Sequence, residues 1–280
     1  MHTLSRSISF NMAFGRYTHA IVCRVPNSIK QCSSAAVGDI NPEVAKKEHE
    51  ELCKILRSLD LDVIELQADE STPECAYVDD TAIIVNGTAL ICRPANTQRQ
   101  KEVDVIRATI KKELEIPVVE IRDTNALIEG GNVLFTGREF FVGISARTNE
   151  AGARALAAAF PEFPVTPIRI PKQLHLKSLL SMAGPDIICL SSGSESQYVK
   201  RQIEREATFQ YQTVTVPDDE AANCLYINGR LVHRREFPES DKEFGNKIDY
   251  DRVSLSATEL CKKGDGLTNL AILVRKSRYF

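Results

Sequence analysis

The chain has 280 residues, of which 43% are hydrophobic and 26% are charged, and its formal net charge is −3. This balance is typical of a soluble globular protein with a hydrophobic core, in one large domain or two ordinary ones. The lysines and arginines are scattered among acids, so no basic stripe indicates a nucleic-acid partner, and no apolar run approaches the ~18–20 residues that cross a bilayer.

Residues 1–11 contain one arginine and no acid, a composition that faintly resembles a transit peptide. The segment is short and lacks strong amphipathicity, so we predict a flexible N-terminal extension followed by a single domain over residues 12–280. We then expect a strand at 18–25, a long loop at 27–40, a helix at 42–59 and a strand at 62–66. Glu48 interrupts the apolar face of that helix, so its first half should be more exposed than its second.

Four hairpins follow, with turn centres near 87, 137, 184 and 229, roughly 45–50 residues apart. Between and after them we predict helices at 102–114, 150–160 and 194–208 and strands at 118–121, 165–170 and 213–216. Residues 237–250 are highly charged and are assigned to the surface. The chain then predicts a strand at 252–255, a short helix at 257–262 and a final strand at 270–274.

The first strand (18–25) and the last strand (270–274) each lack a hairpin partner within their own unit. If they pair, the array of units closes into a ring and leaves no exposed edge strand there. An ordinary α/β sandwich with coincidental spacing is the alternative. The strand–helix order repeats with the turns, which favours the ring.

The chain contains eight cysteines: Cys23, Cys32, Cys53, Cys75, Cys92, Cys189, Cys224 and Cys261. None forms a C-x-x-C pair, so a zinc ribbon or a thioredoxin-like motif has no support. Several lie in apolar runs, where a thiol is usually a small core residue, and we favour this interpretation over disulfides. It predicts a reducing, cytosolic setting, and we expect no metal and no cofactor.

Polar residues gather just before each predicted hairpin and before the last strand. They are Glu74, Asp79 and Asp80; Glu129; His175 and Lys177; Asp218, Asp219 and Asn223; and Asp265 and Asn269. A closed ring would bring these segments together as an acidic pocket with one imidazole. Carboxylates accept well from a planar guanidinium, although each could instead merely solvate a loop end.

Five long segments carry a family resemblance: ADESTPECAYVDDTAII, RPANTQRQKEVD, EGGNVLFTGREFFVGISARTN, LHLKSLLSMAGP and TVPDDEAANCLYIN. They resemble the dimethylarginine dimethylaminohydrolases and, more broadly, the amidinotransferase and arginine deiminase superfamily, from about Phe14 to Lys276. The resemblance implies an α/β fold, the five-bladed α/β propeller (pentein) of ββαβ-type units with pseudo-fivefold symmetry, its ring closed by the N- and C-terminal strands. It also implies hydrolysis of Nω-methylated arginines to citrulline and methylamines, in arginine catabolism and nitric oxide regulation.

The resemblance further implies roles for individual residues. His175 would be the acid/base, oriented by Glu129. Asp79 and Asp80 would hold the guanidinium, although the better-known animal enzymes have a longer glutamate in place of Asp79. The other substrate-binding residues are Glu74 near the amino end, Arg99 and Arg147 on the α-carboxylate, Asp265, and Ser34 in a lid over residues 27–38.

The chain departs from the family where the nucleophile is expected, since the family has a cysteine just before the final apolar strand. Alignment on Thr268 and the strand puts Asn269 there, whereas alignment on Asp-Gly-Leu puts Leu270 there. Neither side chain attacks a guanidinium carbon, and no cysteine follows Cys261.

Three other thiols are candidate replacements for the nucleophile: Cys75, Cys224 and Cys261. Cys75 and Cys224 match positions where the family carries a cysteine that is not the nucleophile, and Cys261 precedes the turn on the predicted short helix.

Three hypotheses therefore stand. The protein hydrolyses methylarginine, or it is a non-catalytic relative that binds methylarginine or arginine or interacts with a protein, or it acts on another guanidine. Its expected partner is a small-molecule methylated arginine or arginine, with no nucleic acid and no membrane, and it would be a monomer or a homodimer.

Overall fold

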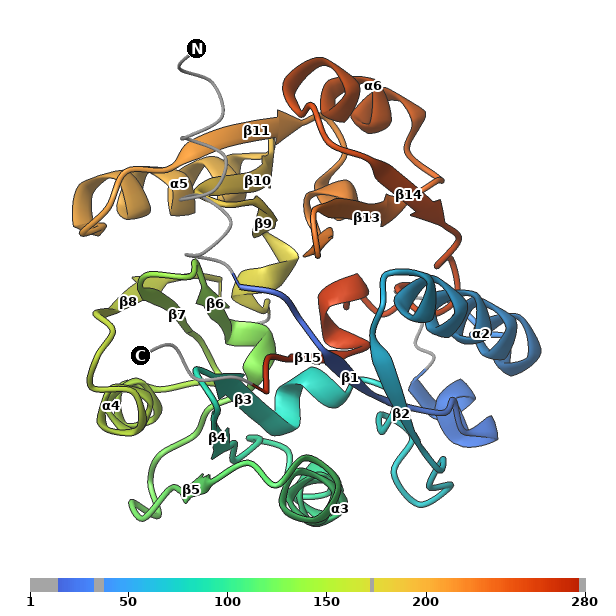
Figure 1. Cartoon of the computed structure of the whole chain (residues 1–280), viewed down its shortest axis with the longest axis vertical. Coiled ribbons are helices and arrows are strands. Elements are labelled where there is room, and N and C mark those ends of the chain that lie inside the picture. The colour runs from blue at the N-terminus through green and yellow to red at the C-terminus, as the bar shows by residue number, and fades with distance from the viewer. Residues whose placement is uncertain (1–14, 33–37, 172–173, 277–280) are drawn as a thin grey trace.

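Five separate three-stranded sheets form the framework of the molecule, which is known from a computed structural model. The structure describes residues 15–32, 38–171 and 174–276. The predicted extension at 1–11 and Ser34 of the predicted lid lie outside these described residues. Figure 1 shows the five sheets arranged around the middle of the molecule, with their helices toward the outside.

Four sheets are each built from one continuous stretch of chain in the order strand, strand, helix, strand. The first two stretches contain β3 (Ala82–Val85), β4 (Thr88–Ile91), α3 (Glu102–Thr109) and β5 (Val118–Glu120), then β6 (Val133–Phe135), β7 (Phe140–Ile144), α4 (Glu150–Ala159) and β8 (Val165–Arg169). The next two contain β9 (Leu180–Gly184), β10 (Ile187–Ser191), α5 (Ser194–Glu206) and β11 (Gln212–Val216), then β12 (Leu225–Ile227), β13 (Arg230–Arg234), α6 (Pro238–Lys247) and β14 (Arg252–Leu255). In every stretch the first two strands pair antiparallel and the third pairs parallel to the second.

The fifth sheet has the same order but is assembled from both ends of the described chain. It contains β15 (Ile272–Val274), β1 (His19–Cys23), α2 (Pro42–Ser58) and β2 (Asp62–Leu66). β1 pairs antiparallel with β15, with His19 opposite Val274, and parallel with β2. The predicted pairing of the first and last strands is confirmed. Within the described residues each sheet stays separate, and the sheets do not join into one closed sheet.

Turn chemistry explains why the hairpins form where the sequence predicts them. Asn86 and Gly87 have φ of +49° and +66°, and Asn228 and Gly229 have φ of +50° and +90°. Two consecutive left-handed residues match the right-handed twist of the strands that they join, and asparagine and glycine are the residues that adopt this conformation readily.

α2 shows how the sequence sets the ends and the faces of a helix. Asn41 caps its first turn by accepting from the backbone N–H groups of Glu43 and Val44. Val44 is exposed, but Ala45, Glu48 and His49 are buried, so the expectation that the first half of the helix is more exposed than the second is wrong. The buried carboxylate of Glu48 accepts from the backbone N–H groups of residues 258–260. The hydrogen bonds that this buried carboxylate needs are therefore supplied by a turn distant in sequence and not by solvent.

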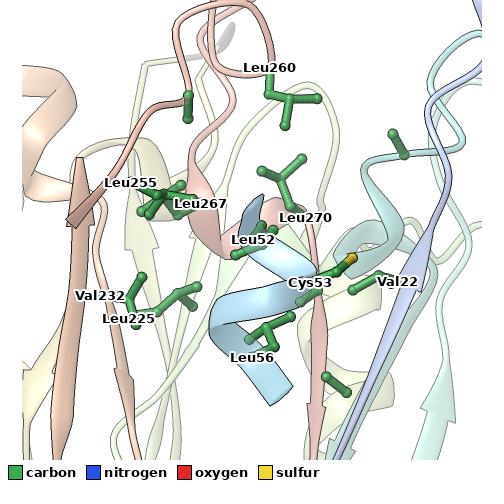
Figure 2. Packing of buried hydrophobic residues seen from close by; sticks show 14 of the residues in the cluster. Val22, Leu52, Cys53, Leu56, Leu225, Val232, Leu255, Leu260, Leu267 and Leu270 are labelled. Carbon is green, nitrogen blue, oxygen red and sulfur yellow. The ribbon is translucent and has the colours of Figure 1, made fainter. Parts of the chain in front are cut away.

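The largest core cluster packs around α2 (Figure 2). It contains residues from two stretches of chain, 20–77 and 225–271. Leu52, Cys53 and Leu56 lie between Val22 of β1 on one side and Leu225 of β12 on the other. This packing ties the fifth sheet to its neighbour, because complete burial of one such leucine contributes roughly 1.5–3 kcal/mol.

The structure corrects several predicted elements. Residues 257–262 form hydrogen-bonded turns instead of a short helix, and Cys261 therefore does not lie on a helix. Part of the charged segment 237–250 is helical, as α6, and buries Phe244. α3 continues as a π-helical turn over Ile110–Leu114, and part of the predicted loop at 27–40 is a 3₁₀ helix, Asn27–Cys32.

A cavity of about 140 Å³ is lined by the first strands of all five sheets, β3, β6, β9, β12 and β15. Asp79, Lys177 and Thr268 also line it. The five sheets thus share one central space. Among the described residues, no helix is both long enough and apolar enough to cross a membrane.

Candidate functional site

A short 3₁₀ helix precedes the first strand of every sheet, and these five turns carry or adjoin the polar residues singled out above. They are Val78–Thr81, Gly130–Asn132, Leu176–Ser178, Asp219–Ala222 and Leu267–Asn269. The first, second and last of these turns contact one another, and the third contacts both the second and the fourth. The predicted gathering of polar segments is therefore present in the fold.

His175 lies at the centre of the resulting charge cluster. Its Nε2 atom is 2.8 Å from Oε2 of Glu129 and 3.9 Å from Oδ1 of Asp80, and its Nδ1 atom is 3.5 Å from Oδ1 of Asp265. Burial disfavours the imidazolium, but the surrounding carboxylates outweigh burial and raise the pKa of His175 to about 10. At neutral pH both ring nitrogens are therefore hydrogen-bond donors.

Asp80 is fully buried and accepts from two groups of the chain. Its Oδ2 atom accepts from Nη1 of Arg99 at 2.6 Å, and its Oδ1 atom accepts from the backbone N–H of Gly131 at 2.9 Å. Burial opposes ionisation, but His175 and Arg99 hold the pKa of Asp80 below its usual value. The carboxylate is ionised and held rigidly beside His175.

Arg99 is also buried and is committed to partners within the protein. Besides Asp80, its guanidinium donates to Glu102 at 3.1 Å and to the backbone carbonyl of Tyr77 at 2.8 Å, and it lies 3.6 Å from Glu74. Through these contacts Arg99 links Asp80, Glu102, Glu74 and the backbone of Tyr77. The resemblance had placed a substrate carboxylate on it, and the structure gives it these partners instead.

Two lysines neutralise the other acids. Nζ of Lys177 donates to Asp79 at 2.8 Å, and burial nevertheless raises the pKa of Asp79 to about 6. Nζ of Lys263 lies 2.6 Å from Oε2 of Glu74 and 3.6 Å from Oδ2 of Asp265. The sequence did not single out Lys263 as a site residue, although it stands two residues before Asp265.

Asn269 completes the cluster. A Cβ placed on Gly131 would lie 2.9 Å from Nδ2 of Asn269, 2.9 Å from Oδ1 of Asp80 and 3.0 Å from Cγ of His175. The three side chains thus approach Gly131 closely, and a side chain at this position would force them to shift. This close approach of three groups to Gly131 could not be predicted from the sequence, because the groups come from distant segments.

Arg147 is the cation of the site that reaches solvent. Its side chain is 33% exposed, and Nη1 lies 3.5 Å from Oε2 of Glu129. A cavity of about 310 Å³ adjoins the cluster and is lined in part by Asp265, Gly266 and Asn223. The side chain of Arg99 is only 3% exposed, so of these two arginines Arg147 is the one that an incoming carboxylate could reach.

Asp80, Glu129 and His175 also offer three ligand atoms within 4.8 Å of one another, a spacing that a metal ion could use. Each of these groups already has a partner, because Arg99 binds Asp80 and the His175 proton faces Glu129. A metal ion would have to displace the proton from an imidazolium whose pKa is about 10. The cluster thus fits a protonated histidine better than a metal.

With this geometry in place, comparison with known proteins gives the family. The sequence model of the family described as "N,N dimethylarginine dimethylhydrolase, eukaryotic" matches residues 24–232. The chain belongs to the dimethylarginine dimethylhydrolase family. This confirms the membership that the five motifs predicted.

Relatives from animals and bacteria match over most of this family member. It is 36% identical over 272 residues to the bovine protein named "Putative hydrolase DDAH2", covering 93% of this chain and 95% of the relative. It is 24% identical over 258 residues to N(G),N(G)-dimethylarginine dimethylaminohydrolase of Pseudomonas aeruginosa, covering 90% and 98%.

Solved structures show the same fold. The Pseudomonas aeruginosa enzyme, as a cysteine-to-serine mutant in complex with citrulline, superposes with a TM-score of 0.81 at 24% identity, covering 93% of this chain and all of that one. The N-terminal domain of ArgZ, an arginine dihydrolase from cyanobacteria, gives a TM-score of 0.77 at 17% identity, covering 93% and 98%.

The thiols of this family member are all free, as the sequence predicted, and each lies among described residues. Cys75 is buried beside Cys23, Cys224 contacts Ser181, and Cys261 belongs to the largest core cluster. Charges of the site act on Cys32, Cys92 and Cys261. Burial raises the pKa of all three thiols, and neighbouring acids add to the effect, so none of them is poised as a thiolate.

Proposed function

We propose that this protein binds an arginine-derived amino acid in the cluster around His175 and lacks the covalent catalysis of its family. The observation that carries the proposal is the place of Asn269, whose amide lies beside His175 and Asp80. Attack on a guanidinium carbon requires a nucleophile such as a thiolate, and an amide is not one. Residues that would recognise the ligand are present around it.

We further propose that the five sheets are the blades of a five-bladed α/β propeller with pseudo-fivefold symmetry, within a single domain over residues 12–280. The repeated order strand, strand, helix, strand and the cavity bounded by all five first strands support this. Eight free thiols support a reducing, cytosolic setting.

The proposed roles follow from exposure and partners. Arg147 binds the ligand's α-carboxylate, since its fork of donors reaches solvent. Asp80 and Asp265 contact the ligand's side chain, and Glu129 holds His175 in orientation. Arg99 is a positioning residue for Asp80 and the neighbouring acids, because its own donors are already engaged.

Hydrolysis of methylated arginines is the second candidate. The 2.8 Å contact between His175 and Glu129 favours it, because an acid/base histidine held by a carboxylate is what such a reaction needs besides its nucleophile.

The deciding experiment is release of citrulline from asymmetric dimethylarginine by the natural chain and by Asn269→Cys. We expect no release above background from the natural chain and measurable turnover from Asn269→Cys. Release by the natural chain that disappears in Cys32→Ser or Cys92→Ser would identify a replacement thiol. Release that survives alkylation of every thiol would contradict the reliance on cysteine.

Binding is tested separately by calorimetry. The natural chain should bind asymmetric dimethylarginine, arginine or citrulline, and Arg147→Ala should weaken that binding at least tenfold while the variant remains folded by circular dichroism. Absence of heat with all three ligands, from protein shown to be folded by circular dichroism, would overturn the proposed function.

A further inference from the structure

One donor of the site has no acceptor. Nδ2 of Asn269 is buried and makes no hydrogen bond within the described part of the chain. The orientation of the amide is fixed by its other end, because Oδ1 accepts from the backbone N–H of Gly266 at 3.1 Å. Turning the amide over would set two donors against each other, so Nδ2 remains the end without a partner.

The unused donor lies next to His175. A Cβ placed on Gly131 would lie 2.9 Å from Nδ2 of Asn269 and 3.0 Å from the ring carbon Cγ of His175, so the amide and the imidazole are neighbours beside Gly131. The imidazole is protonated, since carboxylates surround it, and so it too presents only donors. The amide end of Asn269 and the ring of His175, which meet beside Gly131, therefore both present donors to a ligand.

The acids of the site are already occupied by cations of the chain. Asp80 is paired with Arg99, and Glu129 with His175. Asp79 is likewise paired with Lys177. A guanidinium entering the site would have to compete with these pairs, and it would direct its own N–H groups at the N–H groups of Asn269.

We propose that the site selects a ureido side chain, such as that of citrulline, over a guanidinium. A ureido group has a carbonyl oxygen with two lone pairs in place of one guanidinium nitrogen. That oxygen would accept from the unpaired Nδ2 of Asn269, while the ureido N–H groups would donate to Asp80. It is uncharged, so it leaves the internal ion pairs intact. The inference rests on the proposed function and specifies its ligand.

The difference in affinity between two ligands is large when only one of them pairs with a buried polar group of the site. A site that holds a buried donor rejects a ligand without the matching acceptor, because the donor is left unpaired. We expect the natural chain to bind L-citrulline at least tenfold more tightly than L-arginine, which corresponds to ~1.4 kcal/mol.

The test is calorimetric titration of the natural chain, Asn269→Asp and Asn125→Asp with L-citrulline and L-arginine. Asn269→Asp keeps the acceptor for Gly266 and turns the free donor into an acceptor, so its preference should reverse in favour of arginine. Asn125 is exposed, and Asn125→Asp makes the same change of charge away from the site, so its citrulline preference should equal that of the natural chain.

Arginine binding to the natural chain as tightly as citrulline would overturn the inference and leave the proposed function standing. The same holds if Asn269→Asp keeps the citrulline preference while thermal melting shows that it is folded. Absence of binding by either ligand to the folded natural chain would overturn both.

Discussion

The Nε2 atom of His175 and the Oε2 atom of Glu129 lie 2.8 Å apart, and the two side chains are 5% and 0% exposed. A carboxylate held at this distance inside the protein stabilises the imidazolium far more than one at the surface would. The protonation of His175 is therefore coupled to folding.

Stability should fall with rising pH because of this histidine. Its pKa is raised from 6.5 to about 10 in the folded protein, so its contribution is fully present below pH 6.5 and is lost between pH 6.5 and 10. Urea unfolding at pH 6, 8 and 9.5 should show this decline, and His175→Gln should remove most of it. An equal decline in the variant would show that other groups are responsible.

Arg99→Ala should destabilise the protein by about 3–5 kcal/mol, because it leaves Asp80 and Glu102 buried without their cation. Urea unfolding measures the change in free energy. Arg205→Ala is the matched control, since Arg205 and Glu206 form an ion pair that is largely exposed, and it should change stability by less than ~1 kcal/mol. Similar effects of the two variants would contradict the part assigned to Arg99.

Glu48→Ala should loosen the turn at 257–262, since one carboxylate accepts from three consecutive backbone N–H groups there. We expect a loss of roughly 3 kcal/mol. Faster hydrogen exchange at Thr258, Glu259 and Leu260 would locate the effect. Glu50→Ala, at an exposed position of the same helix, should leave both stability and exchange unchanged.

Asn228→Gly tests a link between the fourth hairpin and the N-terminal strand. Its side chain accepts from the backbone N–H of Tyr17 and donates to the carbonyls of Tyr17 and Leu59, while glycine would keep the left-handed turn. The loss should be ~2 kcal/mol by urea unfolding. Asn86→Gly makes the same change at a turn with an exposed contact to Glu162 and should cost clearly less; equal losses would refute the link.

The hairpins were predictable because their turns have local chemistry, as Asn86 and Asn228 illustrate. α6 was missed because Phe244 is its single fully buried apolar residue, which gives too weak a periodic signal. The short helix at 257–262 was wrong because that segment is organised from a distance, by Glu48. The partners of the site acids could not be predicted from the sequence either. Lys263 and Glu74, for example, are far apart in the sequence and come into contact only in the folded protein.

The pairing of β1 with β15 has a consequence for how the protein folds. Four sheets can form from neighbouring segments as the chain is made, but the fifth joins Thr18 to Val274 across 256 positions and must wait for synthesis to reach Val274. Closure of so long a loop is slow, and Asp265 and Asn269 arrive on the same segment. We therefore expect the ligand site to be the last part of the molecule to assemble, so that binding of a ligand reports completion of the whole fold.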